Sequence, residues 1–387
     1  MKRVKILLFC PVLIWGLMGC RSEAEDIIPY QKENVEEPQV QKQVESVKGF
    51  FLLNEGNMGN NKCTLDYYDA VTGNYIRNIY GQANPDVVQE LGDVGNDIQV
   101  YDNKIWAVVN CSHFVEVMEE STARHITQIS IPNCRYITFQ DDFAYVSSYA
   151  GPVQIDPNAR LGYVAKIDVK SCSVVDTCNV GYQPEEMVIQ GGKLYVANSG
   201  GYRVPNYDHT VSVIDLETFK VIKTIDVAIN LHRMEVDSDG YIWVSSRGDY
   251  FDTPSMTYVI DPKSDEVCDV LEVANSEMAV SGDSLYIYGT EWSYVTNSWE
   301  ISYSIVDTKS REVYVDSMIT DGTDSQIIMP YGIAVNPDTR EFYITDAGNY
   351  VSPGRLYCFS PDGEMKWNVR TGDIPAHFAF TKTGLKY

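Results

Sequence analysis

Residues 194–198 read Leu194-Tyr195-Val196-Ala197-Asn198, a short apolar run with an aromatic residue near its start and a polar residue at its end. Aromatic and β-branched residues in a run of this length favour a β-strand. The same pattern recurs seven times after residue 48. The copies occupy residues 50–54, 105–110, 144–148, 194–198, 242–246, 285–289 and 342–346.

Each copy is followed by a loop and then by a second run that ends in an apolar–acidic pair. A repeat of this length with four strands per unit is typical of a β-propeller. No helical periodicity intervenes between the runs, which argues against folds that alternate strands with helices. The pairs recur every 46 to 53 residues and are Tyr68-Asp69, Met118-Glu119, Ile167-Asp168, Ile214-Asp215, Ile260-Asp261 and Val306-Asp307, with Phe359-Ser360 as a degenerate seventh.

We therefore expect an all-β fold, a seven-bladed β-propeller of four-stranded antiparallel blades over residues 48–387. An eight-bladed ring with one degenerate blade is the alternative, and the count of seven in every strand class argues against it. The chain enters at the second strand of its first unit, at Phe50, and ends with a spare innermost strand over residues 377–381. This C-terminal strand is expected to complete the first blade and to cover the edges that an open ring would expose.

The first 47 residues are predicted to lie outside the propeller. Residues 1–19 have a basic head and a short apolar run, as in a signal peptide, and Leu17-Met18-Gly19-Cys20 resembles the bacterial lipobox. Lipidation at Cys20 and a flexible acidic tether over residues 20–47 follow from this resemblance, and an ordinary signal peptide is the alternative. The acidic cluster after Cys20 resembles the export signal of Bacteroidetes surface lipoproteins. We expect a body exposed on the cell surface, anchored to the outer membrane by lipid alone.

Composition limits the classes of partner and of stabilising bond. The formal net charge is −24, from 30 basic and 54 acidic residues, which argues against nucleic acid as a partner. Seven cysteines remain after residue 20, and an odd number argues against a disulfide framework. Cys172 with Cys178, or Cys111 with Cys134, are possible pairs.

The loops between the second and third strands of the blades are long and aromatic, whereas the opposite turns are short and polar. This asymmetry is typical of a binding face. Trp106 and Trp243 share a strand position with Tyr195 and are expected in the core, whereas Trp292 and Trp299 lie in the longest of these loops. The candidate ligand contacts from the loops are His113, Phe114, Tyr149, Tyr202, Tyr250, Phe251, Trp292, Tyr294 and Tyr350.

The innermost strands supply a second set of candidates. The residue before the first apolar position of each strand is predicted to join a ring at the mouth of the central channel, with Asn96 and Tyr331 beside it. The ring alternates acid and base, so it either neutralises itself and closes the channel or forms the polar floor of a ligand site. Its members are Asp97, Arg135, Glu186, Arg233, Glu277, Gly332 and His377.

Signals for catalysis are weak. The sequence has no Gly-rich phosphate loop, nucleophile elbow, haem-attachment motif or paired-cysteine zinc spacing. His113, His232 and His377 fall on the loop-rich face, and three histidines can bind a metal, although such residues are more often hydrogen-bonded. We expect a protein that is not an enzyme and holds neither cofactor nor metal.

Four segments carry a family resemblance. They are Asn54-Glu55-Gly56-Asn57, residues 91–98, residues 108–113 and residues 331–337. Together they resemble the YncE-like seven-bladed propeller lipoproteins of Bacteroides, and most of all the branch that captures cobalamin. The resemblance implies a surface lipoprotein that binds vitamin B12 or another corrinoid and passes it to a TonB-dependent outer-membrane transporter of the BtuB type. The alternatives are a propeller that binds a glycan or a protein and a metal-assisted lyase or lactonase.

Overall fold

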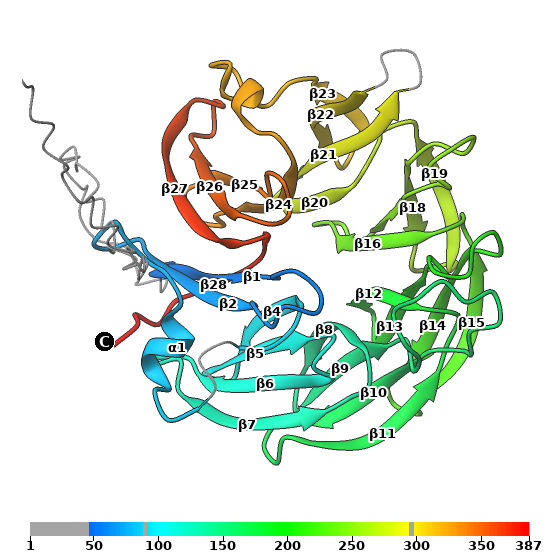
Figure 1. Cartoon of the computed structure of the whole chain (residues 1–387). Coiled ribbons are helices and arrows are strands. Elements are labelled where there is room, and N and C mark those ends of the chain that lie inside the picture. Colours follow the sequence, from blue (N-terminus) through cyan, green and yellow to red (C-terminus); the bar gives the residue numbers. More distant parts are fainter. Residues whose placement is uncertain (1–45, 88–90, 294–297, 387) are drawn as a thin grey trace, which may run out of the picture.

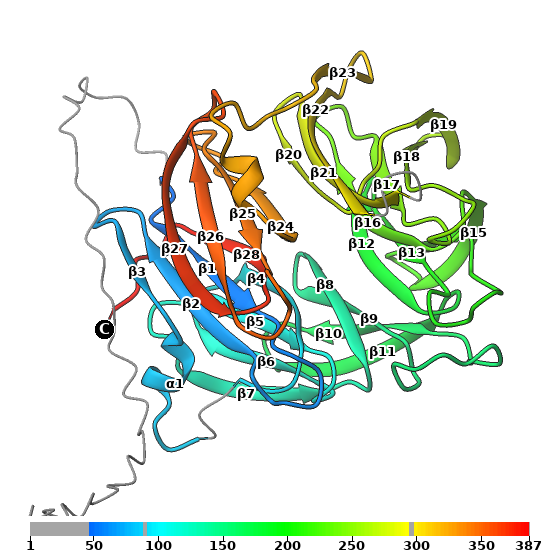
Figure 2. The ribbon, with the colours of Figure 1, turned by 45° about the horizontal axis from the view of Figure 1, so that its top comes forward.

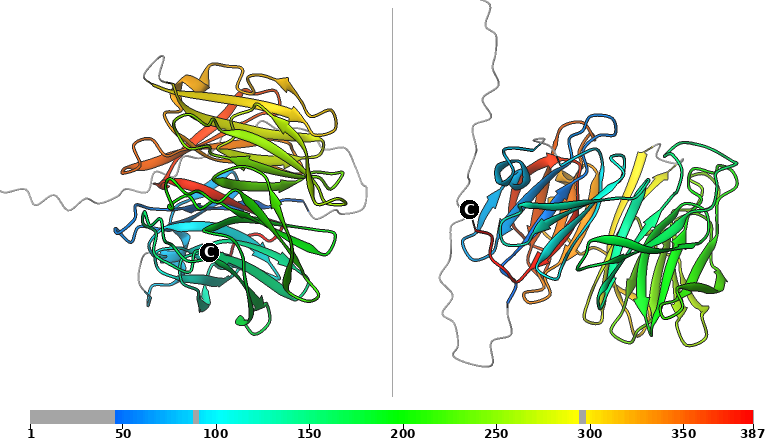
Figure 3. Two further views of the ribbon diagram at one scale, coloured as in Figure 1. Left: turned by 90° about the vertical axis from the view of Figure 1, so that its right-hand side faces the viewer. Right: turned by 90° about the horizontal axis from the view of Figure 1, so that it is seen from below.

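The computed structural model describes residues 46–87, 91–293 and 298–386. Seven four-stranded antiparallel sheets follow one another around a ring (Figures 1 and 2). Side views show the sheets as separate blades stacked against their neighbours (Figure 3). The predicted seven-bladed propeller is therefore confirmed. The expected signal peptide, Cys20 and nearly all of the expected tether lie outside the described residues.

Each blade runs from an innermost strand at the centre to an outermost strand at the rim. The innermost strands are β4 (Gly95–Tyr101), β8 (Cys134–Gln140), β12 (Pro184–Gln190), β16 (Leu231–Val236), β20 (Glu277–Ser281), β24 (Pro330–Val335) and β28 (Pro375–Thr381). The second strands, which hold the repeated aromatic pattern, are β1 (Gly49–Asn54), β5 (Lys104–Val109), β9 (Phe143–Ser148), β13 (Lys193–Asn198), β17 (Ile242–Ser246), β21 (Ser284–Ser293) and β25 (Phe342–Asp346).

The outer half of each blade is less buried. The third strands are β2 (Thr64–Asp69), β6 (Phe114–Glu119), β10 (Tyr163–Asp168), β14 (Thr210–Asp215), β18 (Met256–Asp261), β22 (Ser298–Asp307) and β26 (Pro353–Phe359). The outermost strands are β3 (Asn74–Ile76), β7 (His125–Ser130), β11 (Ser173–Asn179), β15 (Lys220–Asp226), β19 (Glu266–Leu271), β23 (Glu312–Val315) and β27 (Met365–Asp373). One short helix, α1 (Ile79–Ala83), and one 3-10 turn, η1 (Thr323–Gln326), interrupt this pattern in the described chain.

The ring is closed as the sequence predicts. Strand β28 pairs antiparallel with β1, with Phe50 opposite Phe380 and Phe51 opposite Ala379. The first blade thus combines the two ends of the propeller, seen as blue and red strands side by side in Figure 1. Pairing satisfies the backbone groups of both strands, which an open ring would leave as an unprotected edge.

The core lies between adjacent blades. Trp106 of β5 packs with Ile137 and Val146 of the next blade, and Trp243 of β17 packs with Leu285 and Ile287 in the same way. Both tryptophans are fully buried, as expected from their shared strand position. Side chains alternate along each strand, so each second strand contributes apolar groups to the interface on either side of its blade.

Candidate functional site

A β-bulge at the start of the innermost strands builds the floor of the site. In β12 the pairing steps from Pro184 opposite Asn198 to Met187 opposite Val196, so Glu185 and Glu186 together face one residue of β13. Register shifts at the corresponding place occur in β4, β8, β16 and β24, and where β28 meets β1. A bulge re-aims side chains and is common beside binding sites. Here it brings two consecutive residues from one strand to the channel mouth.

The bulge corrects the predicted ring. By register, Asp97, Glu186 and Arg233 occupy the second bulge position, and the residue equivalent to them in β8 is Tyr136. Arg135 occupies the first bulge position of its strand, as Glu185 does in the next blade. The ring read from sequence therefore mixed two layers, because the bulge adds one residue that a regular strand does not have.

In the first layer, one carboxylate is shared by two arginines. Nε and Nη2 of Arg135 donate to the same oxygen of Glu185 at 3.2 and 3.0 Å, and Arg247 lies 3.7 Å from the other oxygen. The Tyr149 hydroxyl also donates to Glu185. Burial alone would raise the pKa of the Glu185 carboxyl, but the charges of Arg135 and Arg247 outweigh it and hold that pKa below its ordinary value.

In the second layer, one arginine is shared by two carboxylates. Arg233 forms an ion pair with Glu277 and lies 3.9 Å from Glu186. Burial raises the pKa of the Glu277 carboxyl to about 8, against the pull of Arg233 and with a further rise from Glu186. Charges of the predicted ring thus pair with each other, and Arg135, Arg233 and Glu277 also line a cavity, while the floor of a ligand site stays a prediction.

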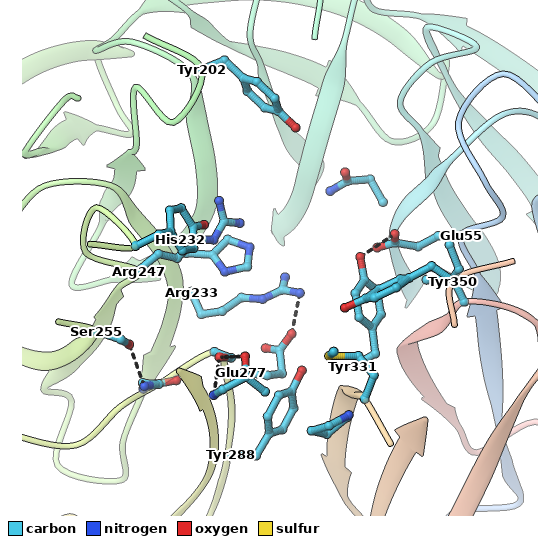
Figure 4. Close-up of a pocket in the computed structure, with 18 of the residues that line it drawn as sticks. Glu55, Tyr202, His232, Arg233, Arg247, Ser255, Glu277, Tyr288, Tyr331 and Tyr350 are labelled. Carbon is cyan, nitrogen blue, oxygen red and sulfur yellow. Dashed lines mark hydrogen bonds and ion pairs between the residues drawn. The ribbon is translucent and has the colours of Figure 1, made fainter. Parts of the chain in front are cut away.

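His232 lies among these arginines (Figure 4). Its Nε2 is 3.0 Å from the hydroxyl of Tyr136. Burial, and then the charges of Arg247, Arg233 and Arg135, hold the pKa of His232 well below its ordinary value. The imidazole is therefore neutral at physiological pH, and its Nδ1 is buried with no hydrogen-bond partner among the described residues.

The opposite side of the cavity is built from tyrosines around Glu55. The Tyr331 hydroxyl donates to Glu55 at 2.9 Å, and Nε2 of His377 lies 3.0 Å from the other oxygen. The rings of Tyr331 and Tyr350 meet edge to face, 5.7 Å apart. Figure 4 shows these tyrosines across the cavity from His232, Arg233 and Arg247.

Above this floor stands an aromatic rim. Trp292 and Trp299 lie opposite each other on β21 and β22, with ring centroids 5.7 Å apart, and are 40% and 49% exposed. They were expected in a loop, but the second and third strands of this blade extend to ten residues each and carry them on a hairpin. Tyr250 and Phe251 follow β17, and Phe251 is 74% exposed.

Floor and rim enclose one cavity of about 1030 Å³. A second hollow of about 440 Å³ lies beside it, lined by Met58, His113 and Arg160 among others. The predicted contacts that line the larger cavity are Asn96, Arg135, Tyr149, Tyr202, Arg233, Tyr250, Phe251, Glu277, Trp292, Tyr331 and Tyr350.

Five predicted contacts lie elsewhere, and Tyr294 is outside the described residues. Asp97 and Glu186 accept backbone N–H groups of Ile137 and Met234, each at 2.8 Å, and His377 is held by Glu55. His113 borders the smaller hollow. Phe114 was expected in a loop but begins β6 and packs against the core of the first two blades.

Several lining residues were not among the predicted contacts. They come from the two bulge positions, from the loops after β1 and β17 and from the long hairpin. A sequence signal for the bulge exists, because two polar residues in succession break the alternation expected of a strand, as in Glu185-Glu186. The missed residues that line the cavity include Glu55, Tyr136, His232, Arg247, Tyr288 and Trp299.

Residues 46–87, 91–293 and 298–386 contain no candidate metal site, disulfide or membrane-spanning helix. No group of three or more His, Cys, Asp or Glu side chains is placed to hold a metal ion there. All seven cysteines of this part are free, so neither Cys172–Cys178 nor Cys111–Cys134 is a disulfide. None of its helices is long and apolar enough to cross a membrane.

Solved structures with a similar fold are numerous, and three illustrate their range. A functionally unknown protein from Desulfotomaculum acetoxidans has a TM-score of 0.60 at 10% identity, covering 88% of this chain and 100% of its own. A putative 6-phosphogluconolactonase from Bacteroides fragilis has a TM-score of 0.58 at 10% identity, covering 88% of this chain and 100% of its own. A quinonprotein alcohol dehydrogenase-like protein from Bacteroides thetaiotaomicron has a TM-score of 0.53 at 14% identity, covering 86% of this chain and 78% of its own. At such identities the likeness establishes the fold alone.

The sequence itself gives one assignment. No curated protein matches it. A family model described as a domain of unknown function, DUF5074, matches residues 48–373, which is nearly the whole propeller. The chain therefore belongs to the DUF5074 family.

Proposed function

We propose that this protein is a non-enzymatic surface lipoprotein that binds a corrinoid of the vitamin B12 class and passes it to a TonB-dependent outer-membrane transporter. The observation that carries the proposal is the broad cavity of about 1030 Å³ on the loop face, with an ionic floor and an aromatic rim. The identity of the ligand rests on the resemblance of residues 54–57, 91–98, 108–113 and 331–337 to the cobalamin-binding propeller lipoproteins.

The size of the cavity suits a large ligand. Its volume of about 1030 Å³ lies at the upper end of the roughly 300–1,000 Å³ usual for small-molecule sites. A corrinoid is broad and flat, with amide groups around its edge. Aromatic side chains such as Trp292 and Tyr350 can lie against its apolar parts, while Asn96, Asn275 and the arginines supply partners for the amides.

The closed ring supports tight binding. The floor residues belong to strands that pair on both sides of the bulge, and Arg135, Arg233 and Glu277 are held by ion pairs. Little conformational entropy is therefore lost when a ligand arrives, which is the main advantage of a preorganised site. The proposed surface location rests on the signal peptide, the lipobox-like Cys20 and the acidic segment after it.

Titration of residues 21–387 with cyanocobalamin tests the ligand. We expect saturable one-to-one binding by calorimetry, with quenching of tryptophan fluorescence because Trp292 and Trp299 line the cavity. Absence of binding at micromolar concentration would refute the proposal. A glycan array and metal analysis of the purified protein cover the alternatives, since a selective glycan or a stoichiometric removable ion would favour a glycan-binding propeller or a metal-assisted enzyme.

The transfer step has its own test. The lipidated protein should co-purify with a TonB-dependent transporter from detergent-solubilised outer membranes of its native host. Deletion of its gene should slow corrinoid uptake by cells at limiting vitamin concentration. Normal uptake in the deletion strain would contradict the transport role and leave the binding result standing.

A further inference from the structure

We propose that the side of the cavity formed by blades three to five is a subsite for an oxyanion of the phosphate class, bound by Arg247 and Arg135. The inference deepens the proposed function, on which the identity of the complete ligand still rests. It follows from unused hydrogen-bond donors and from the local balance of charge.

Arg247 is the strongest element of the subsite. It lies in the loop after β17, lines the cavity and has a side chain that is only 25% exposed. A guanidinium carries five N–H donors. Among the described residues its side chain makes no hydrogen bond, and its ion-pair partner, Glu185, is 3.7 Å away. The nitrogens of this half-buried guanidinium are not themselves buried, so their open donors are accessible to a ligand or to solvent.

Arg135 adds a second set of donors. Its Nε and Nη2 both donate to a single oxygen of Glu185, and its Nη1 makes no hydrogen bond within the described chain. The ring of Tyr149 lies 4.8 Å below the guanidinium carbon and limits its movement. Arg135 is thus held in place by Glu185 and Tyr149 while one amino group remains available to the cavity.

The balance of charge on this side is positive. Arg135 and Arg247 face the single carboxylate of Glu185, which is 1% exposed and does not line the cavity. Arg233, which contacts Glu277, lies next to them. The histidine among them reports the same field, because the three arginines help to hold the pKa of His232 well below its ordinary value. This positive region stands out in a chain whose net charge is −24.

The geometry of arginine favours an oxyanion over a neutral group. Its planar fork matches the spacing of phosphate or carboxylate oxygens, and such charge-assisted bonds are the stronger kind. Among corrinoids, cobalamin carries a phosphodiester in the loop to its nucleotide base, whereas cobinamide lacks that loop. The two compounds therefore separate recognition of the phosphate from recognition of the ring.

The test compares Arg247→Gln with Arg160→Gln, a matched control. Arg160 is exposed beside the smaller hollow and does not line the main cavity, so both variants lose one charge from this region of the molecule. Loss of a charge-assisted bond should weaken cyanocobalamin binding by about tenfold or more in Arg247→Gln. Cobinamide binding should change less than about twofold, and Arg160→Gln should affect neither ligand. Equal weakening of both corrinoids by Arg247→Gln would overturn the subsite.

A second measurement does not depend on corrinoid binding. Inorganic phosphate should raise the Tm of the wild-type protein and of Arg160→Gln, but not of Arg247→Gln, relative to chloride at equal ionic strength. Acetate serves as the carboxylate probe, and an equal rise with acetate would refute the assignment to phosphate. No rise in the wild-type protein would refute the subsite. If phosphate acts as expected but cyanocobalamin does not bind, the subsite stands and the proposed ligand is wrong.

Discussion

Two pairs of tryptophans occupy opposite environments in this propeller. Trp106 and Trp243 lie on second strands, between blades, and are fully buried. Trp292 and Trp299 face each other on the long hairpin, about half exposed, at the rim of the cavity. The same residue type therefore fills the interior in one region and lines an open cavity in the other.

The difference lies in what surrounds each ring. Trp106 meets Phe139 edge to face at 5.3 Å, and its Nε1 donates to the carbonyl oxygen of Tyr101 at 3.3 Å. Nε1 of Trp243 donates to Asp237 at 2.9 Å. The ring of Trp292 meets the ring of Trp299 edge to face and lines the cavity. Burial between blades contributes to folding, whereas exposed aromatic surface is available for a ligand.

The largest effect on stability is expected from Trp106→Ala. Removing this side chain leaves a void between the second and third blades, because the surrounding strands cannot close on it. The free energy of unfolding should fall by about 3–5 kcal/mol, measured by urea unfolding followed by circular dichroism. A loss comparable to that of Trp292→Ala would mean that the two environments do not differ as described.

The next effect concerns binding. Trp292→Ala removes a rim ring without opening the core, so affinity for the ligand should fall by about 1–3 kcal/mol with little change in unfolding. Tyr250→Ala should act similarly, since Tyr250 lines the same cavity. Calorimetric titration with cyanocobalamin measures the first quantity and urea unfolding the second. Loss of stability without loss of affinity would place the binding face elsewhere.

The sequence predicts the scaffold well because the scaffold is repeated. The aromatic position held by Trp106, Tyr195 and Trp243 recurs in each blade, so every copy supports the same interpretation. The closing strand was also predictable. In a closed ring, an extra innermost strand at the C-terminus can pair with the exposed edge of the first blade.

The site was predicted less completely because it depends on departures from the repeat. The bulge moved Arg135 out of the predicted ring, brought His232 to the cavity and placed Glu185 in a buried position against Arg135. The hairpin extended β21 and β22 beyond the length of other strands, so Trp292 was read as a loop residue. The long hairpin belongs to one blade, so no second copy supports it. The bulge recurs in several blades, but the residue that it adds to each strand shifts the alignment from which the ring was predicted.

The smallest expected effect is on the pH dependence of stability. It compares two carboxylates, Glu235 near the channel and Glu266 at the outer rim, as the tryptophans were compared above. Glu235 on β16 is half-buried, and desolvation, followed by repulsion from Glu186 and Glu277, raises its pKa well above the ordinary value of about 4.3. The folded state then binds this proton more tightly than the unfolded state does. The resulting stabilisation is fully present below about pH 4 and is lost as the pH rises towards the folded pKa.

Glu235→Gln should therefore reduce the decline in stability between about pH 5 and 8. The variant should match the wild-type protein near pH 4 and exceed it by about 1 kcal/mol at pH 8, measured by urea unfolding across this range. Glu266→Gln is the matched control, because Glu266 lies exposed on β19 and should leave the profile unchanged. Parallel profiles for the wild-type protein and Glu235→Gln would mean that the Glu235 carboxyl is solvated, as the carboxyl of the exposed Glu266 is.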